Sequence, residues 1–373
     1  MKLVIAGGGT GGHLFPGIAV AEALIRLHPN AEVLFVGTER GIEARAVPKA
    51  GFSVDFIRIG GLKRVGLKKK LTTMWALPAS ILESRRILQR FGATAVLGVG
   101  GYASGPVLLA ARTLGLPTAI CEQNSVPGLT NRVLGKWVQQ VYASFSSSRM
   151  YFPSQKFQLV GNPVRDAFRR AAKGASIPHD PDLVFVFGGS QGARVLNQSA
   201  PLAMAKLRER GIPVRAVHQA GKNEVDEVRA AYEKAGVAAE VTPFIDDMVS
   251  VYRRAAVVLC RAGATSCAEL TALGVPSILV PFPFAADDHQ TTNAMDLVEK
   301  GAANMLSQAQ LSAETLADSL ATFLTDSDMR NQVAMKARDA GYLDAADVVA
   351  RAAVDGFPRV PETKLLDEQG VRS

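Results

Sequence analysis

The stretch KLVIAGGGTGGH (Lys2–His13) decides the fold, because it places an apolar run directly before a glycine-rich turn. A second stretch of the same build, DLVFVFGGSQGA (Asp182–Ala193), restarts the pattern halfway along the chain. Each predicts a buried β-strand that runs through a glycine turn into a helix, which is the opening unit of a parallel α/β sheet. We therefore expect two similar α/β domains.

The rest of the chain alternates strand and helix signals in the same way. Helices are expected over residues 18–25 and 267–273. The other strand-like runs lie at residues 32–36, 95–99, 118–121, 214–217, 257–259 and 277–280. A Gly-Asn-Pro turn in GNPVR (161–165) breaks the chain and predicts a domain boundary after residue 162. This alternation favours parallel sheets.

Composition narrows the class of protein. The chain has 373 residues, 48% of them apolar, which suits two folded domains. No apolar run approaches the ~18 residues of a membrane-spanning helix, and no secretion signal is expected. The three cysteines, Cys121, Cys260 and Cys267, lack metal-site spacing and suit a reducing cytosol.

The positive charge gathers in the first half of the chain. The net charge is +8, yet residues 1–160 hold 19 Lys and Arg against 7 Asp and Glu. Such an asymmetry indicates an anionic partner for this half: a nucleic acid, a membrane surface or a phosphate-bearing substrate.

The first glycine turn matches G-x-G-x-x-G at Gly7, Gly9 and Gly12, which is also typical of dinucleotide-binding domains. The acidic residue that binds ribose in such domains would then be Glu32 or Glu39. From this turn alone, NAD binding and a merely structural turn both stay open.

Two further glycine turns follow strands, GVGGYASGP (98–106) and GGSQGAR (188–194). A dinucleotide enzyme needs one such turn, whereas three indicate anion-binding sites for more than one phosphate group. The alternative is that the glycines only permit tight turns.

His13 follows the first turn at the start of a helix, where the helix dipole disfavours its charged form. A neutral imidazole there can act as a general base near pH 7. The alternative is a histidine that caps or packs locally.

The second half carries a small-residue turn and helix start in RAGATSCAEL (261–270). Backbone N–H groups at such a helix start suit a diphosphate, and the Glu269 carboxylate one turn along can accept from ribose hydroxyls. Glu269 could equally serve only to pair with the helix dipole, worth about 0.3–1 kcal/mol. The polar loop of residues 287–293 that follows can hydrogen-bond sugar hydroxyls.

In these motifs the chain resembles the MurG family, the N-acetylglucosaminyltransferases of glycosyltransferase family 28 that act in peptidoglycan synthesis. The resemblance covers nearly the whole chain. Its carriers, in order, are GGGTGGHLFPG, GVGGYASGP, CEQNSVPGLTNR, GNPVR, GGSQGARVLNQ, RAGATSCAEL and HQTTNA.

The resemblance implies an α/β fold of the GT-B type, with two Rossmann-like domains whose parallel sheets face each other across a cleft. Residues 1–162 would form the acceptor and membrane-side domain, with a C-terminal helix at about 340–357 packing back on it. Residues 163–339 would bind the UDP-sugar donor, and residues 358–373 would form a tail.

The implied reaction is the inverting transfer of N-acetylglucosamine from UDP-N-acetylglucosamine to the 4-hydroxyl of undecaprenyl-pyrophosphoryl-N-acetylmuramyl-pentapeptide, the step from lipid I to lipid II. No cofactor and no metal site are expected. The adjacent pairs Asp246-Asp247 and Asp287-Asp288 differ from the Asp-x-Asp of metal-dependent transferases, and we interpret them as caps or turn residues.

The resemblance also assigns roles to single residues. His13 is the candidate base, and Glu122 and Tyr102 are further catalytic candidates. The substrate-binding candidates are Thr10, Gly11, Gly12, Asn124, Arg165, Ser190, Phe244, Ile245, Ala264, Thr265, Ser266, Cys267, Ala268, Glu269, Gln290 and Asn293. Cys267 departs from the aliphatic or small residue expected there, with little consequence for a stretch that binds through its backbone.

A lipid-linked acceptor accounts for the charge asymmetry. Residues 63–90 mix eight Lys and Arg with apolar residues and Trp75, a composition suited to an anionic membrane surface. A solvated loop followed by a core-facing helix is the alternative, and a nucleic-acid partner is disfavoured by the lack of a known motif. We expect a peripheral protein on the cytoplasmic face of the inner membrane.

Three rival functions stay open at this point. A UDP-N-acetylglucosamine 2-epimerase would share the fold and lack a lipid acceptor. An NAD-dependent oxidoreductase would use the first glycine turn, and a UDP-sugar-binding regulator would bind the donor without catalysis.

Overall fold

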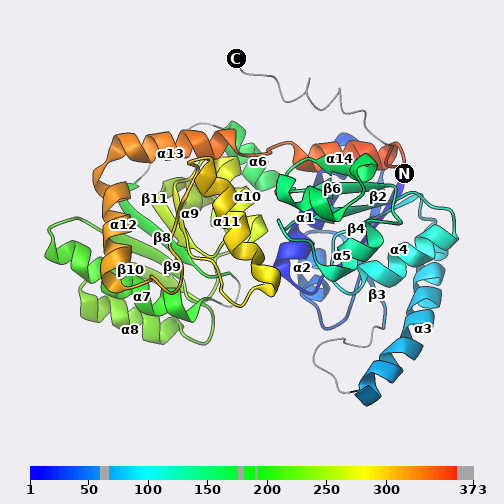
Figure 1. The fold of residues 1–373 in the computed structure, drawn as a ribbon, viewed down its shortest axis with the longest axis horizontal. Coiled ribbons are helices and arrows are strands. Elements are labelled where there is room, and N and C mark those ends of the chain that lie inside the picture. Colours follow the sequence, from blue (N-terminus) through cyan, green and yellow to red (C-terminus); the bar gives the residue numbers. More distant parts are fainter. Residues whose placement is uncertain (59–66, 175–179, 190–191, 359–373) are drawn as a thin grey trace. The chain divides into compact units, whose positions relative to one another are not determined.

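The computed structural model describes residues 1–58, 67–174, 180–189 and 192–358, with side chains for all of these except 67–76. Contacts divide the chain into two units. Unit 1 comprises Met1–Arg165 together with the chain from Asp344 onward, and unit 2 comprises Asp166–Leu343. Each unit is an α/β sandwich around a parallel sheet (Figure 1).

The described part of unit 1 holds a seven-stranded sheet in the order β3-β2-β1-β4-β5-β6-β7, and every neighbouring pair is parallel. Its strands are β1 (Lys2–Ala6), β2 (Glu32–Gly37), β3 (Ser53–Phe56), β4 (Ala95–Gly98), β5 (Thr118–Glu122), β6 (Gln140–Ala143) and β7 (Phe157–Leu159). Its helices are α1 (Gly11–Leu27), α2 (Glu43–Lys49), α3 (Leu67–Phe91), α4 (Ser104–Thr113), α5 (Leu129–Leu134) and α14 (Ala345–Val354), with short 3-10 turns η1 (Ser146–Tyr151) and η2 (Ser154–Lys156).

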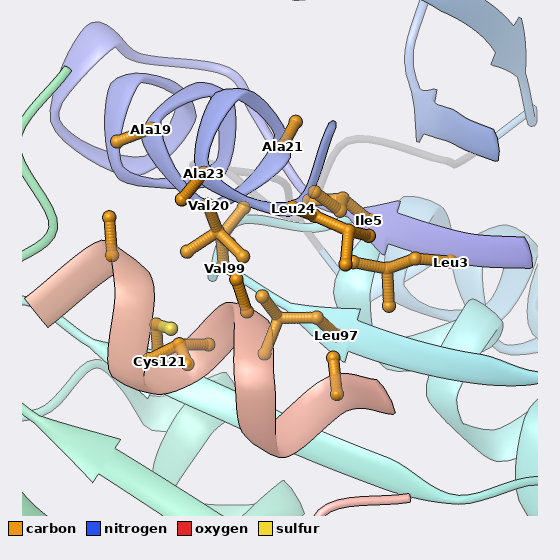
Figure 2. Packing of buried hydrophobic residues seen from close by; sticks show 14 of the residues in the cluster. Leu3, Ile5, Ala19, Val20, Ala21, Ala23, Leu24, Leu97, Val99 and Cys121 are labelled. Carbon is orange, nitrogen blue, oxygen red and sulfur yellow. The ribbon is translucent and has the colours of Figure 1, made fainter. Parts of the chain in front are cut away.

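Alternating side chains of β1 divide the core of unit 1 between the two faces of the sheet. Leu3 and Ile5 pack with α1 and α14 in one fully buried cluster (Figure 2). Val4 and Ala6 face the other cluster, which α3, α4 and α5 cover. This alternation is the period of two that a β-strand imposes. An ion pair between Arg26 and Asp347 also joins α1 to α14.

Helix α1 begins at Gly11, earlier than the start at Ile18 that the sequence predicts. Glycine and proline are weak helix formers, so Gly11, Gly12 and Pro16 hide this start from a propensity argument. Packing overrides that weakness, since Leu14, Pro16 and Gly17 are buried. As a result His13 lies in the first turn of the helix.

The described part of unit 2 repeats the architecture with six parallel strands in the order β10-β9-β8-β11-β12-β13. They are β8 (Asp180–Phe187), β9 (Arg215–Gln219), β10 (Ala238–Thr242), β11 (Ala255–Cys260), β12 (Ser277–Leu279) and β13 (Asn304–Met305). The helices are α6 (Asp166–Lys173), α7 (Arg194–Glu209), α8 (Val225–Ala235), α9 (Met248–Arg254), α10 (Ala264–Leu273), α11 (His289–Glu299), α12 (Ala313–Thr325) and α13 (Ser327–Asp339), with the 3-10 turn η3 (Ala286–Asp288).

The sheet of unit 2 is also covered on both faces. Helices α7, α8 and α12 bury an apolar cluster with β8, β9, β11 and β12. On the other face an aromatic group packs edge to face around Tyr252, whose ring centroid lies 5.4–5.9 Å from those of Phe168, Phe185 and Phe187. Coverage of both faces is what an all-parallel sheet requires.

Each sheet reverses its strand order once, between β1 and β4 in unit 1 and between β8 and β11 in unit 2. Ligands of open parallel sheets bind in the crevice at such a reversal, outside the carboxyl ends of the strands. All three glycine turns of the sequence follow the strands at these reversals. None of the helices in the described ranges is long and apolar enough to cross a membrane.

Candidate functional site

The two glycine turns of unit 1 touch each other at the strand reversal. The backbone N–H of Gly8 donates to Gly100 O at 3.3 Å. A Cβ at Gly101, whose φ is +81°, would lie 2.4 Å from Gly8 O. No other residue allows this approach without displacing the backbone, so the turns following β1 and β4 form one glycine-lined surface.

His13 stands at the edge of this surface, half-buried, with Nδ1 3.1 Å from Oε1 of Gln123. Thr10 is the N-cap residue of α1, and its carbonyl accepts from the His13 N–H at 3.3 Å. Gly11 and Gly12 complete the first turn. The structure therefore brings Thr10, Gly11, Gly12 and His13 together at one helix end, where backbone N–H groups favour an anion.

Tyr102 lies in the second glycine turn, directly after Gly101, and has 42% of its surface exposed. The ring therefore lies at the surface of unit 1 and outside its core. Its assignment as a catalytic candidate stays a prediction.

Glu122 ends β5 and is buried, with 1% of its surface exposed. Its carboxylate accepts from Asn124 N and from Asn131 Nδ2, each at 2.9 Å. Burial raises the pKa of Glu122 to about 7, against the opposing effect of these hydrogen bonds. The side chain thus anchors the loop that carries Asn124.

This raised pKa gives a stability that depends on pH. The unfolded carboxyl has a pKa near 4.5, so the folded state favours the protonated form and loses stability as pH rises from about 4.5 to 7. We expect Glu122→Gln, which stays neutral, to lack this slope. The difference in unfolding free energy between the two proteins should change by roughly 3 kcal/mol over that range. Urea denaturation of both proteins at pH 4.5, 5.5 and 7.5 measures this difference. If the unfolding free energies of the two proteins changed in parallel with pH, the raised pKa of Glu122 would be contradicted.

Glu43 is a site residue that the sequence analysis missed. It is 1% exposed, and its carboxylate accepts from Gly9 N at 2.8 Å and from Thr38 N at 2.8 Å and Oγ1 at 3.0 Å. The buried Glu43 carboxylate therefore holds the first glycine turn in place through Gly9 N. No local pattern marks it, since Gly9 and Glu43 are 34 residues apart.

The two residues considered for NAD ribose binding lie at opposite ends of β2. Glu32 begins β2, at the edge of the sheet opposite the glycine turns, and pairs with Lys2 Nζ at 3.0 Å. Glu39 follows β2 and is exposed. Glu32 thus cannot reach a dinucleotide at the first glycine turn.

Arg165 ends unit 1, and its guanidinium lies 4.8 Å from the centroid of the Phe15 ring. Stacking on an aromatic face holds the charge in a set orientation. The assignment of Arg165 as a substrate-binding residue stays a prediction.

Unit 2 contains a pocket of about 560 Å³ at its own strand reversal. It is lined by Gly188, Gly192, Ala193, Arg194, Val195, Gln198, Arg261, Phe282, Gln290 and Gln308. The pocket joins the glycine turn that follows β8 to the segments that follow β11 and β12. Gln290 is thus brought to the third glycine turn, and its Oε1 accepts from Phe282 N at 3.0 Å.

Arg261 and Gln308 are lining residues that the sequence analysis did not select. The Arg261 guanidinium donates to Val280 O at 3.1 Å, to Pro281 O at 2.9 Å and to Gln308 Oε1 at 2.8 Å. It also lies 5.3 Å from the centroid of the Phe282 ring. These contacts tie three segments together and place a positive charge at the pocket wall.

Gln219, at the end of β9, connects two other predicted parts of the donor site. It donates to Gly189 O at 2.9 Å and accepts from Ile245 N at 2.9 Å. Phe244 beside Ile245 is 50% exposed. The structure thus places Phe244 and Ile245 next to the third glycine turn, through a glutamine that no sequence motif marks.

Helix α10 begins with the predicted diphosphate stretch. Ala264 is its first residue, so Ala264, Thr265 and Ser266 form the first turn, with Ala268 and Glu269 one turn on. Glu269 is 6% exposed, and Tyr252 OH donates to its Oε2 at 3.4 Å.

Two of the remaining candidates face inward. Cys267 is buried, and burial raises the pKa of its thiol to about 12, so it stays neutral. Asn293 is fully buried and donates to Ala262 O at 3.1 Å, which ties α11 to the turn before α10.

Ser190 lies outside the described residues. Asp247 caps α9 by accepting from Ser250 N at 3.2 Å, which confirms its predicted role. Asp287 and Asp288 have φ of +51° and +50°, a strained conformation. The prediction of a polar loop over residues 287–293 is wrong beyond these two residues, because α11 begins at His289. In the ranges that the structure covers, no three His, Cys, Asp or Glu side chains gather in a group that could hold a metal ion.

Comparison with known proteins agrees with this arrangement. Residues 3–143 match the glycosyltransferase family 28 N-terminal domain, and residues 183–349 match the glycosyltransferase family 28 C-terminal domain. A protein of Myxococcus xanthus (strain DK1622) is 48% identical over 355 residues, which cover 95% of this chain and 93% of that protein. It is named UDP-N-acetylglucosamine–N-acetylmuramyl-(pentapeptide) pyrophosphoryl-undecaprenol N-acetylglucosamine transferase.

Two solved structures share the fold at different levels of identity. The crystal structure of MurG from Acinetobacter baumannii is 31% identical, with a TM-score of 0.76, and covers 95% of this chain and 99% of that one. A UDP-GlcNAc 2-epimerase from Neisseria meningitidis, solved bound to UDP-GlcNAc, is 14% identical, with a TM-score of 0.67 over 95% of this chain and 100% of its own. The epimerase therefore shares the fold alone.

Two parallel-sheet units with glycine turns at both strand reversals form a GT-B fold, and the two domain matches identify its class as a glycosyltransferase. The chain belongs to glycosyltransferase family 28.

Proposed function

We infer that this protein transfers N-acetylglucosamine from UDP-N-acetylglucosamine to the lipid-linked N-acetylmuramyl-pentapeptide, the step from lipid I to lipid II. The observation that carries the inference is the 48% identity, along 95% of the chain, to a transferase named for this reaction. In support, the motifs that suggested it lie at the carboxyl edges of the two sheets. The protein is an N-acetylglucosaminyltransferase.

Unit 1 supplies the base in this reaction. An inverting transfer needs a group that removes the proton of the attacking 4-hydroxyl. His13 stands beside the glycine-lined surface, where backbone N–H groups at the start of α1 favour the acceptor's diphosphate. Thr10, Gly11, Gly12 and Tyr102 belong to the same glycine-lined surface.

Unit 2 binds the donor. Helix α10 directs the backbone N–H groups of its first turn at the UDP diphosphate, which lowers the energy of the leaving group as negative charge develops. Glu269 accepts from the ribose hydroxyls, and Phe244 and Ile245 contact uracil. Gln290 belongs to the sugar end through the pocket that it lines. Asn293 is fully buried, so it supports the donor site indirectly, through its bond to Ala262 O before α10.

A transfer assay tests the function. Labelled UDP-N-acetylglucosamine is incubated with a short-chain analogue of the lipid acceptor, and the label is expected in the lipid fraction. Unlabelled lipid would reject the transferase; epimerised sugar formed without acceptor would favour the 2-epimerase, and donor binding without turnover would favour a regulator. Titration with NAD completes the comparison, because NAD binding without UDP-sugar binding would favour the oxidoreductase.

The membrane contact is also part of the proposal. Of the predicted segment 63–90, residues 63–66 lie outside the described residues, as do the side chains of 67–76. Further along α3, Ile87 and Leu88 are buried in the core, whereas Leu77 and Leu82 are 44% and 50% exposed. The later part of this segment therefore packs as a core-facing helix, whose exposed side carries these two leucines together with Arg86 and Arg90.

A second apolar surface, which we call the α5 patch, adds to this contact. Leu129, Val133, Trp137 and Met150 are 78%, 47%, 48% and 82% exposed. Cations surround the patch: Arg132 stacks 4.5 Å from the Tyr151 ring, and Lys156 Nζ donates to Lys136 O at 2.8 Å. Exposed apolar side chains among cations suit the surface of an anionic leaflet. We place the protein on the cytoplasmic face of the inner membrane, held peripherally.

Removing the apolar character of the α5 patch should weaken membrane binding. For Leu129→Glu combined with Trp137→Glu, we expect affinity for phosphatidylglycerol-containing vesicles to fall by about tenfold or more, since each buried apolar side chain contributes roughly 1.5–3 kcal/mol. Vesicle sedimentation measures the change. Leu202→Glu is the matched control, a 58% exposed leucine of unit 2. Equal binding of the double variant and of Leu202→Glu to the vesicles would contradict a membrane role of the α5 patch. The 63–90 segment is tested separately by combining Lys68→Glu, Lys69→Glu and Lys70→Glu, which should weaken binding to the same vesicles.

A further inference from the structure

Gln123 lies directly after β5 and is buried, with 1% of its surface exposed. Its Nε2 donates to two backbone carbonyls, Val99 O at 3.2 Å and Cys121 O at 3.2 Å. Because a carbonyl oxygen only accepts, these two bonds determine which end of the amide is the nitrogen. The other end, Oε1, therefore faces His13.

Oε1 of Gln123 lies 3.1 Å from Nδ1 of His13. An amide oxygen cannot donate, so the hydrogen of this bond is on Nδ1. In the neutral ring the basic lone pair is then on Nε2. Gly100 limits the ring from another side, because a Cβ there would lie 2.8 Å from Nδ1.

We propose that Gln123 is a positioning residue that holds His13 in the Nδ1–H tautomer, so that Nε2 is the atom that takes the proton of the acceptor hydroxyl. The proposal rests on the transferase function inferred above. In the step, the hydroxyl O–H bond breaks and its proton moves to Nε2. The oxygen forms a bond to the anomeric carbon, whose bond to the diphosphate breaks, and UDP leaves with that electron pair.

A neutral amide suits this role better than a carboxylate would. A carboxylate at the same place would favour the imidazolium, which has no lone pair with which to accept a proton. The amide orients the ring and selects the tautomer without adding a charge. Gln123 itself touches no reacting atom, so it acts only through His13.

Two variants separate this role from a structural one. Gln123→Met keeps the approximate length and removes both the acceptor and the donor. Gln123→Glu keeps an acceptor for Nδ1 and, when ionised, cannot donate to Val99 O or Cys121 O. If Gln123 served only to bind these two carbonyls, both variants would lose turnover to the same degree. If it acts through Oε1, only Gln123→Met removes the acceptor that holds the hydrogen of His13 on Nδ1.

The tautomer is measured directly by nitrogen-15 NMR of histidine-labelled, ligand-free protein. The chain has five histidines, so the His13 signals are assigned by their loss in His13→Ala. The spectra are compared at a pH high enough that the ring is neutral in every variant, because a carboxylate at position 123 favours the imidazolium. There we expect the Nδ1–H form in the wild type and in Gln123→Glu, and a shift toward Nε2–H in Gln123→Met. Turnover should fall roughly 10- to 100-fold in Gln123→Met, a part of what a general base contributes, with KM values for both substrates within about twofold.

The outcomes are distinct. A wild-type His13 with hydrogen on Nε2 would overturn the proposal whatever the activity. Equal loss of turnover and of the Nδ1–H form in both variants would overturn it in favour of the structural role. Absence of transfer by the wild-type protein would instead reject the proposed function, because the tautomer is measured without substrate.

Discussion

His13→Ala is expected to reduce turnover by about 10²–10⁴-fold, the range that a positioned general base contributes. The loss belongs to the chemical step, because the imidazole lies on the glycine-lined surface of unit 1, whereas the donor pocket is built from residues of unit 2. UDP affinity should therefore stay close to that of the wild type. Turnover with the short-chain lipid acceptor and calorimetric titration with UDP measure the two quantities separately.

His28→Ala is the matched control for this variant. His28 is the C-cap residue at the far end of the same helix, α1, and it is exposed. The His28→Ala protein should turn over at the wild-type rate. A His13→Ala protein that turns over at more than about a tenth of the wild-type rate would remove His13 as the base, and a large loss of UDP affinity would indicate a binding role instead.

Much of the fold follows from local patterns in the sequence. The apolar runs at residues 32–36, 118–121 and 257–259 all lie within strands, and the glycine turns follow strands as predicted. Short apolar runs between glycine turns carry this information within a few residues. The start of α1 was missed, since Gly11, Gly12 and Pro16 contradict helix propensity and only packing supports the helix there.

The residues that hold the site in place could not be found in this way. Gln123 reaches His13 across 110 positions, Glu43 reaches Gly9 across 34, and Gln219 reaches Gly189 across 30. None belongs to a spacing that a strand or helix would impose. Motifs identify the residues expected at the ligand, whereas the buried polar groups behind them depend on the tertiary fold.

Glu43 shows how closely such a supporting group is enclosed. A Cβ at Gly8, Gly37 or Gly41 would lie 2.1–2.4 Å from an atom of the Glu43 side chain. Three glycines thus leave just the space that this carboxylate fills. Because the carboxylate also accepts from Gly9 N, a displacement of the Glu43 side chain would break this bond or move the first glycine turn.

Gly41→Ala should therefore damage both stability and activity. The new methyl group would meet Glu43 Oε2 at 2.1 Å, and Gly41 has an ordinary backbone conformation, so the effect is one of contact alone. Overpacking costs about 1–3 kcal/mol, or roughly 2–12 °C in the melting temperature of a unit of this size. We expect at least about tenfold slower transfer as the displaced carboxylate releases Gly9, with unchanged UDP affinity.

Two further variants make this prediction sharp. Gly105→Ala is the control for stability, because a Cβ at Gly105 in α4 meets nothing within 4 Å; its thermal unfolding should match that of the wild type. Glu43→Gln turns an NH₂ group toward backbone donors and should cost about 1–3 kcal/mol. Since both changes act on one carboxylate, their effects should be non-additive in the double variant. Additive losses, or a Gly41→Ala protein as stable as Gly105→Ala, would show that the glycine turn does not depend on Glu43.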